Sequence, residues 1–413
     1  MSIKSRPRNP VTRQLLRWAI GLSIAVSALA GRWTPGLAAE TPPRAALEGL
    51  SAALQPPPPP ASGLPGQEQN PWLSIFPELA QAPAPAWVRE GVRITYRLES
   101  ATIAQDPDQK SSAAAGYLQY DIVAIDGSAV VSSVKMYLDT DSGAVQPSIV
   151  MAARGRPGIG DYWLNPGVLA KAGQVASDEL KVISGPATIG TKSYQVVRFE
   201  YHPKEQAAEY IWMVDPKTGL LLYYRYAIGA EDAASRQTGI MTFVQQRQLP
   251  VPWQAAAAPD WLTPDGYLAY EGEYAVEIPG SPATSLPYTV VARVTQTSER
   301  WTDFQLTDSL SGSTNSSVER VTGVAQLTDG LWLPPEAIAS LQDGQVLDQD
   351  PVTGDQLTAS VNPDHTVTLT EAGAGYQSAL TYSAHDGKLV GFESQSIVGI
   401  ATIRITMQLS DWQ

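Results

Sequence analysis

The chain has no cysteine and only 3 histidines among its 413 residues. The absence of cysteine excludes disulfide bonds, thiolate metal sites, cysteine nucleophiles and lipid anchors attached to cysteine. Charged residues make up 17% of the sequence, and the formal net charge is −13. An acidic chain lacks the basic surface that attracts nucleic acids and anionic membranes, so we expect no nucleic-acid partner.

No apolar run at the start of the chain is long enough to cross a membrane. The run Ala19–Ala30 has 12 residues, whereas a spanning helix needs about 20. It ends in the small residues of Ala28-Leu29-Ala30, and five basic residues with no acidic one precede it: Lys4, Arg6, Arg8, Arg13 and Arg17. This order predicts a secretory signal peptide over residues 1–30, with cleavage after Ala39 as an alternative. We expect general secretion and a periplasmic or extracellular chain that is not integral to the membrane; an uncleaved anchor or a buried helix is the other interpretation.

A proline-rich stretch follows the predicted signal peptide. Residues 41–86 hold 12 of the 33 prolines, including the unbroken run Pro56–Pro60. Such composition favours polyproline II, so residues 31–86 are predicted to be a disordered spacer. Two pieces within it, Ala45–Leu54 and Trp72–Leu79, are apolar enough to dock against a folded domain.

From Trp87 onward the apolar residues recur with a period of two. Strict alternation predicts antiparallel strands with one buried face and one solvent-exposed face; it occurs in Val92–Leu98, Val134–Met136, His365–Leu369 and Ile403–Leu409. Two short helices are predicted, one starting at Asn165-Pro166 and the other at Pro334-Pro335. The chain is therefore predicted to be mainly β.

An internal duplication divides this β region. The matching landmarks are Trp87 with Trp261, Trp163 with Trp332 before the two helices, Asp215–Gly219 with His385–Gly387 at a turn, and Trp253 with Trp412. A repeat of this length indicates tandem copies of one unit. We predict two β domains at residues 87–253 and 261–413, joined by a linker at 254–260.

One segment resembles a known family. Residues 210–226, from Tyr210-Ile-Trp212 through Asp215-Pro-Lys-Thr-Gly219 to Arg225-Tyr226, resemble a hairpin of the LolA-like and RseB-like periplasmic lipoprotein-carrier superfamily. The resemblance implies an open β half-barrel around a short helical plug, with an apolar concave face that binds acyl chains or lipoproteins. The predicted fold is two tandem antiparallel half-barrels of this kind, each with one short plug helix.

No catalytic constellation is found. The histidines His202, His365 and His385 share no metal-ligand spacing, and no G-x-S-x-G nucleophile motif is present. Gly155–Gly160 lacks the lysine of a phosphate-binding loop. The acidic segments Asp139–Gly143 and Asp348–Asp355 are predicted to be turns, with weak surface Ca²⁺ binding as the alternative. We therefore predict no enzyme activity, no metal and no cofactor.

Aromatic residues are the better candidates for a binding site. Trp163, Trp212, Trp332 and Tyr382 lie at or near equivalent places in the two repeats and are our candidate ligand-binding residues. Large rings in such places also serve as core anchors, and that interpretation stays open.

Three functions remain in order of preference. The first is an exported, non-catalytic cell-envelope protein that binds an apolar or lipidated ligand, with a lipid or a lipoprotein as candidate partner. The second is an interaction or scaffold module for an envelope protein partner. The third is a secreted glycan-active enzyme that uses dispersed carboxylates and tryptophan platforms.

Overall fold

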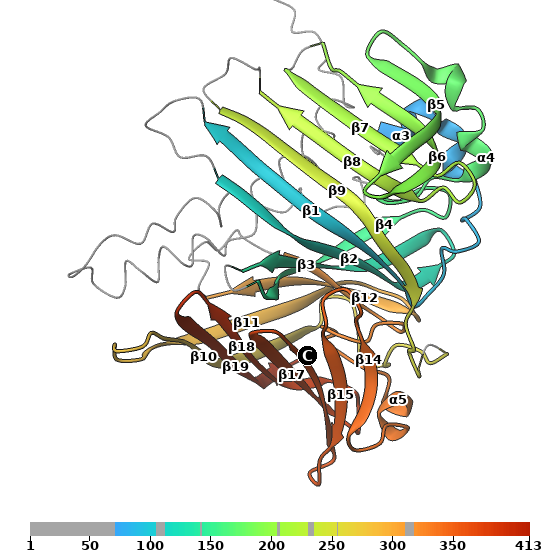
Figure 1. The fold of residues 1–413 in the computed structure, drawn as a ribbon. Coiled ribbons are helices and arrows are strands. Elements are labelled where there is room, and N and C mark those ends of the chain that lie inside the picture. Colours follow the sequence, from blue (N-terminus) through green and yellow to red (C-terminus); the bar gives the residue numbers. More distant parts are fainter. Residues whose placement is uncertain are drawn as a thin grey trace, which may run out of the picture.

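The protein is described by a computed structural model that covers residues 71–104, 112–140, 143–204, 207–229, 235–253, 255–309 and 318–413. The predicted signal peptide and residues 31–70 of the predicted spacer lie outside the described residues. Within these ranges the chain forms two antiparallel sheets and a few short helices, which confirms the predicted mainly-β fold. Figure 1 shows the first sheet, coloured blue to yellow, above the second, coloured orange to red.

The first sheet comprises nine strands in the described ranges, in the spatial order β4-β3-β2-β1-β9-β8-β7-β6-β5. The strands are β1 (Val92–Ala104), β2 (Ser112–Asp126), β3 (Ala129–Asp139), β4 (Val145–Gly155), β5 (Leu180–Ile189), β6 (Lys192–Tyr201), β7 (Ala208–Val214), β8 (Leu221–Ile228) and β9 (Ser235–Gln248).

The second sheet comprises ten described strands in the order β13-β12-β11-β10-β19-β18-β17-β16-β15-β14. The strands are β10 (Tyr267–Glu277), β11 (Thr284–Thr297), β12 (Trp301–Asp308), β13 (Val318–Gly323), β14 (Gln345–Gln349), β15 (Gln356–Val361), β16 (Thr366–Gly373), β17 (Tyr376–Ser383), β18 (Leu389–Val398) and β19 (Ala401–Trp412). In both sheets the first strand pairs with the second and the last, and the described strands at the two ends do not pair to close a barrel. The predicted open antiparallel sheets are therefore confirmed.

Each sheet has an inner face, which carries its hydrophobic core, and an outer face. On β1, Ile94, Tyr96 and Leu98 belong to the first core, whereas Arg93 and Thr95 point to the outer face. The second core is separate and includes Tyr270, Leu369 and Leu380. Strand alternation thus places the apolar set of each sheet on one side, as the period of two requires.

Short helices begin where proline and a capping residue predict them. The side chain of Asn165 accepts a hydrogen bond from the backbone N–H of Val168 (3.1 Å) and starts α4 (Pro166–Leu169), which a 3₁₀ turn η3 (Ala172–Val175) follows. The second helix is α5 (Pro335–Ala339). Both are shorter than one would infer from the apolar residues that follow. Among the described residues, no helix has the length and apolar character needed to span a membrane.

The same hydrogen bonds recur around the hairpin turn of each repeat. The backbone N–H of Leu164 donates to Gly219 O in the first, and that of Leu333 donates to Gly387 O in the second, both at 2.9 Å. Likewise the indole N–H of the preceding tryptophan binds the turn, from Trp87 to Thr218 O (2.8 Å) and from Trp261 to Asp386 O (2.7 Å). Three of the four sequence landmarks therefore occupy matching places.

The fourth landmark pair does not match. Trp253 is 3% exposed and lies in the second core, whereas Trp412 is half-exposed at the end of β19, with Lys388 Nζ 3.4 Å from its ring centroid. Trp253 comes 8 residues before Trp261, so it belongs to the segment that leads into the second sheet. The expected equivalence was wrong because a tryptophan near a strand end packs on whichever core it reaches.

A substitution at Gly219 tests the close approach between the hairpin turn and Leu164. Its φ of 73° is left-handed, and a Cβ there would lie 1.8 Å from the carbonyl oxygen of Leu164. Gly127→Ala is the matched control, because its φ is also positive (51°) but nothing lies within 4 Å. We expect Gly127→Ala to lower the free energy of unfolding by about 1–2 kcal/mol for the left-handed backbone alone. Gly219→Ala should lose clearly more in a denaturant titration; equal losses would contradict the close approach.

Candidate functional site

A segment from outside the strands covers the inner face of the first sheet. It contains α3 (Pro71–Ile75) and the 3₁₀ turn η2 (Pro77–Ala80), and we call residues 71–84 the docked segment. Phe76 is 1% exposed and Leu79 is fully buried in the first core. Figure 1 shows α3 over the part of the sheet formed by β5, β6 and β7. The apolar stretch Trp72–Leu79, which the sequence marked as able to dock, lies here.

Aromatic edges make the main contact between the docked segment and the strands. The ring centroid of Trp72 lies 4.7 Å from that of Phe199 and 5.4 Å from that of Trp212, both in edge-to-face geometry. Phe76 meets Phe199 at 6.2 Å in the same way. Such pairs add about 0.5–1.5 kcal/mol each beyond the burial of area. Phe199 and Trp212 face each other across β6 and β7, so two neighbouring strands supply one aromatic receiving surface.

Few polar contacts join the docked segment to the other described residues. Within the described ranges, none of the backbone hydrogen bonds joins residues 71–84 to a strand. The side-chain N–H of Asn165 donates to Pro83 O (2.8 Å), and an exposed pair joins Lys171 to Glu78 at 3.7 Å. Gly158 lets the chain approach closely, since a Cβ there would lie 2.6 Å from Leu79 O. The docked segment is thus held by apolar contact rather than by a strand ladder.

The four candidate ligand-binding residues all lie inside the two cores. Trp163 is 3% and Trp212 is 9% exposed in the first core, and Trp332 and Tyr382 are fully buried in the second. The structure brings Trp163 and Trp212 into one core but does not join them with Trp332 and Tyr382. Their role as ligand contacts stays a prediction, and of the four only Trp212 contacts the docked segment through an aromatic ring pair.

The inner face of the second sheet is covered differently. Leu249 and Trp253, which precede β10, are buried in the second core, and Val251, Ala256 and Ala258 pack against it. This connecting segment is tied to a strand at each end, β9 before it and β10 after it. It cannot leave its core without moving a sheet.

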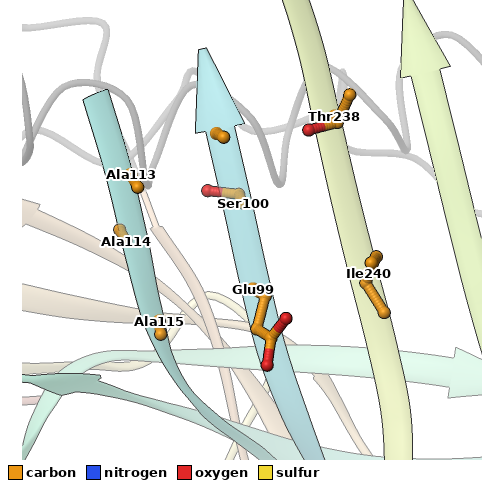
Figure 2. Close-up of a pocket in the computed structure, with 8 residues that line it drawn as sticks. Glu99, Ser100, Ala113, Ala114, Ala115, Thr238 and Ile240 are labelled. Atoms are coloured by element: carbon orange, nitrogen blue, oxygen red, sulfur yellow. The ribbon is translucent and has the colours of Figure 1, made fainter. Parts of the chain in front are cut away.

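A shallow depression of about 420 Å³ lies where β1 ends and where β2 and β9 begin. Figure 2 shows the small side chains of Ala113 and Ala115 on β2, Glu99 on the neighbouring β1 and Ile240 on β9. Among the described residues that line it, Glu99 is the one that carries a charge, and none of the four predicted binding residues is among them.

Charged side chains meet where the outer face of the first sheet contacts the second sheet. Arg93, 4% exposed, binds Asp121 through two hydrogen bonds of 2.7 Å and reaches Asp350 at 2.9 Å. Arg247 joins Asp350 at 3.0 Å and holds Asp348 in a bidentate pair. Burial by itself would raise the pKa of Asp350, but Arg93, a backbone N–H and Arg247 lower it to about 2.

A second group of charges centres on Lys135. Its ammonium pairs with Glu371 and, at 3.0 Å, with Asp329. Burial raises the pKa of Glu371 to about 7 despite Lys135. The pKa of Asp329 is lowered, because the effect of Lys135 and Arg320 outweighs that of burial.

In almost every ion pair across this junction, the first sheet supplies the cation and the second sheet supplies the carboxylate. Residues 261–413 contain 5 Lys and Arg against 19 Asp and Glu. Arg154 on the first sheet follows this rule, since it pairs with Asp303 and Glu319 on the second. Among the described pairs across the junction, only Arg300 with Glu90 has its cation on the side of the second sheet. An apolar cluster of Val123, Val131, Trp301 and Val321 lies beside them. The expectation that the polar face of β1 meets solvent was therefore wrong at Arg93, which the second sheet covers through Asp350, and at Thr95, which is fully buried.

The sequence marked Trp72–Leu79 as able to dock but did not indicate where, and it gave no sign of the charged junction between the sheets. Trp72 carried a usable signal, since it stands in an apolar stretch within a proline-rich region. Arg93, Lys135 and Arg247 carried none, because a cation on the polar side of an alternating strand has the same pattern whether it faces water or a partner sheet. The acidic segment Asp348–Asp355 does form a turn, in which Asp350 accepts from the N–H of Val352 at 2.8 Å. In the described part of the chain no group of three or more acidic or histidine side chains is arranged to hold a metal ion.

Comparison with known proteins places the chain in no family. No family model matches it, and no curated protein matches it. Among solved structures it is similar to MucB in complex with MucA(peri), at 10% identity over 82% of this chain and 93% of that chain, with a TM-score of 0.20. A Nostoc punctiforme protein of the DUF3598 family, of unknown function, follows at 9% identity over 78% and 97%, with a TM-score of 0.15. Transferrin binding protein B from Neisseria meningitidis is at 8% over 74% and 60%, with a TM-score of 0.14. Likeness at this level supports no inference about function.

Substitution of Asp350 is the most direct test of the buried ion pairs at the junction between the sheets. Asp350→Asn leaves Arg93 buried with one carboxylate fewer, and breaking a buried pair in this way costs about 3–5 kcal/mol of unfolding free energy. Asp178→Asn is the control, because Asp178 is 89% exposed and pairs with Lys204 at the surface, which is worth about 0–1 kcal/mol. The wild-type contribution of Asp350 should be present above pH 4 and be lost as the pH falls toward 2, since its folded pKa is lowered. Equal losses in the two variants would place the Arg93 cluster in solvent.

Glu371 should change the free energy of unfolding with pH in the opposite direction to Asp350. Because its pKa is raised when folded, the folded state takes up a proton first, and the free energy of unfolding should rise as the pH falls from 8 to 5. Glu371→Gln should reduce this slope without removing it, since burial also raises the pKa of Glu319 and Asp161 to about 7. Glu336→Gln, an exposed change on α5, should leave the slope as it is. Thermal unfolding at several pH values measures it, and an unchanged slope in Glu371→Gln would refute the assignment.

Proposed function

We propose that this chain is an exported, non-catalytic cell-envelope protein that binds an apolar or lipidated ligand on the inner face of its first sheet. The observation that carries the proposal is the docked segment. An apolar stretch from outside the strands occupies this face beside Trp212, and in the described ranges no backbone hydrogen bond ties it to a strand. A face that holds one apolar occupant mainly through side-chain contacts can accept another.

The balance of energies also favours exchange. Each buried large apolar side chain contributes roughly 1.5–3 kcal/mol, and the docked segment buries two fully, Phe76 and Leu79, with Trp72, Leu73 and Ile75 partly buried. Ordering each backbone residue costs about 1–2 kcal/mol. Over the ten residues 71–80, which comprise α3, Phe76 and η2, the two contributions are of similar size. Docking is therefore close to balanced, and a ligand of moderate affinity can compete.

The export part of the proposal rests on the sequence. A basic start, a 12-residue apolar run and the small residues before Gly31 are the features of a secretory signal. The absence of cysteine fits a chain that needs no disulfide outside the cell, and its acidic charge leaves nucleic acid out of consideration.

A fluorescent fatty acid provides the test. We expect Phe76→Ala in the mature chain to raise probe affinity, because the docked segment then covers the face less well. Adding Trp212→Ala should remove that binding, whereas adding Tyr223→Ala should retain it, since Tyr223 lies on the other side of the same hairpin. Circular dichroism confirms that each variant is folded. If Trp212→Ala leaves probe binding unchanged, the ligand does not bind at this face. If native mass spectrometry shows no bound or acquired lipid, the scaffold function is favoured.

A further inference from the structure

The cover of the first sheet is a peptide, and so is the cover of the second. Leu79 stands 8 residues before Trp87, and Trp253 stands 8 residues before Trp261; both are buried in the core of the sheet that follows. The two tryptophans are equivalent, since each donates its indole N–H to the hairpin turn of its own sheet. Both repeats therefore have a peptide segment at this position, and they differ only in how that segment is attached to the strands.

The first sheet also carries a polar group suited to a peptide. Asn165 is 8% exposed and serves two partners: its side-chain oxygen accepts from Val168 N–H at the start of α4, and its side-chain N–H donates to Pro83 O in the docked segment. A buried N–H that loses its acceptor without replacement costs roughly 1–3 kcal/mol. A ligand that displaces residues 71–84 must therefore bring its own acceptor there. A peptide carbonyl does so, whereas the hydrocarbon part of an acyl chain does not.

Backbone proximity points the same way. At Gly158 a Cβ would lie 2.6 Å from Leu79 O and 2.8 Å from the Cβ of Ala82. The loop before α4 is therefore shaped to pass close to another main chain. Glycine at such a point serves the near approach of a backbone.

We propose that the ligand of the first sheet is an apolar, aromatic peptide segment of a partner protein, and that residues 71–84 are its built-in competitor. This rests on the function proposed above and makes the ligand specific. The partner segment presents large apolar side chains spaced as in Trp72, Phe76 and Leu79, toward Phe199 and Trp212, with a backbone carbonyl toward Asn165. The docked segment lies at the end of the predicted proline-rich spacer, so its release frees an arm without disturbing any strand.

The experiment titrates a labelled synthetic peptide of residues 71–84 into the mature full-length chain. Wild type should bind it weakly, and Phe76→Ala should bind it at least tenfold more tightly because its own segment docks less well. A second variant, with residues 71–84 replaced by a Gly-Ser linker of equal length, should do the same. A peptide with serine in place of Trp72, Phe76 and Leu79 is the control and should not bind.

Asn165→Asp separates a peptide ligand from an acyl chain. It keeps the oxygen that caps α4 but removes the N–H donor. In the Phe76→Ala background it should weaken the peptide at least tenfold and leave a fluorescent fatty acid unchanged. If the fatty acid binds and the peptide does not, the peptide inference is wrong and the proposed function stands. Equal peptide binding by wild type and Phe76→Ala would exclude competition, and binding of neither probe to any folded variant would reject both proposals.

Discussion

An open antiparallel sheet has an apolar face that its own strands cannot cover, and this constraint shapes the whole molecule. In the first sheet the docked segment and α4 provide the cover. In the second, the chain between β9 and β10 provides it, with Trp253 and Leu249 in the core. Each repeat therefore depends on residues that precede its first strand. The difference lies in attachment: one cover is held by two strands, and the other enters from outside the sheets.

The junction between the sheets determines which apolar face can be reached. Glu371 follows Val367 and Leu369 on the inner side of β16, yet it pairs with Lys135 on the first sheet. The first sheet thus covers part of the inner face of the second. Buried ion pairs of this kind lose much of their attraction to desolvation, so their main effect is to fix orientation. The second sheet is thus covered from two directions, whereas the docked segment on the first sheet is not held between two of the described strands.

Aromatic residues illustrate how far a sequence can define a site. Trp163, Trp212, Trp332 and Tyr382 were chosen for their positions in the repeat, and all four are buried. Core anchoring and ligand binding both require a large apolar ring on the inner face, so composition cannot separate them. Trp212 is set apart by its contact with Trp72, a residue 140 positions earlier in the chain. Asn165 was predicted as a helix cap, but its second bond to Pro83 depends on where the docked segment lies.

Local rules determined a large part of this structure from the sequence. Alternation defined the strands, Asn165-Pro166 and Pro334-Pro335 started the helices, and Gly219 and Gly387 marked the hairpin turns, because each depends on neighbours within a few residues. The tertiary structure decided that Arg93 is buried, that Trp253 joins the second core and that residues 71–84 cover the first. Arg93 and Asp350 are 257 residues apart, and no local pattern records which distant surface will cover a polar strand face. Only the packing of the two sheets supplies that partner.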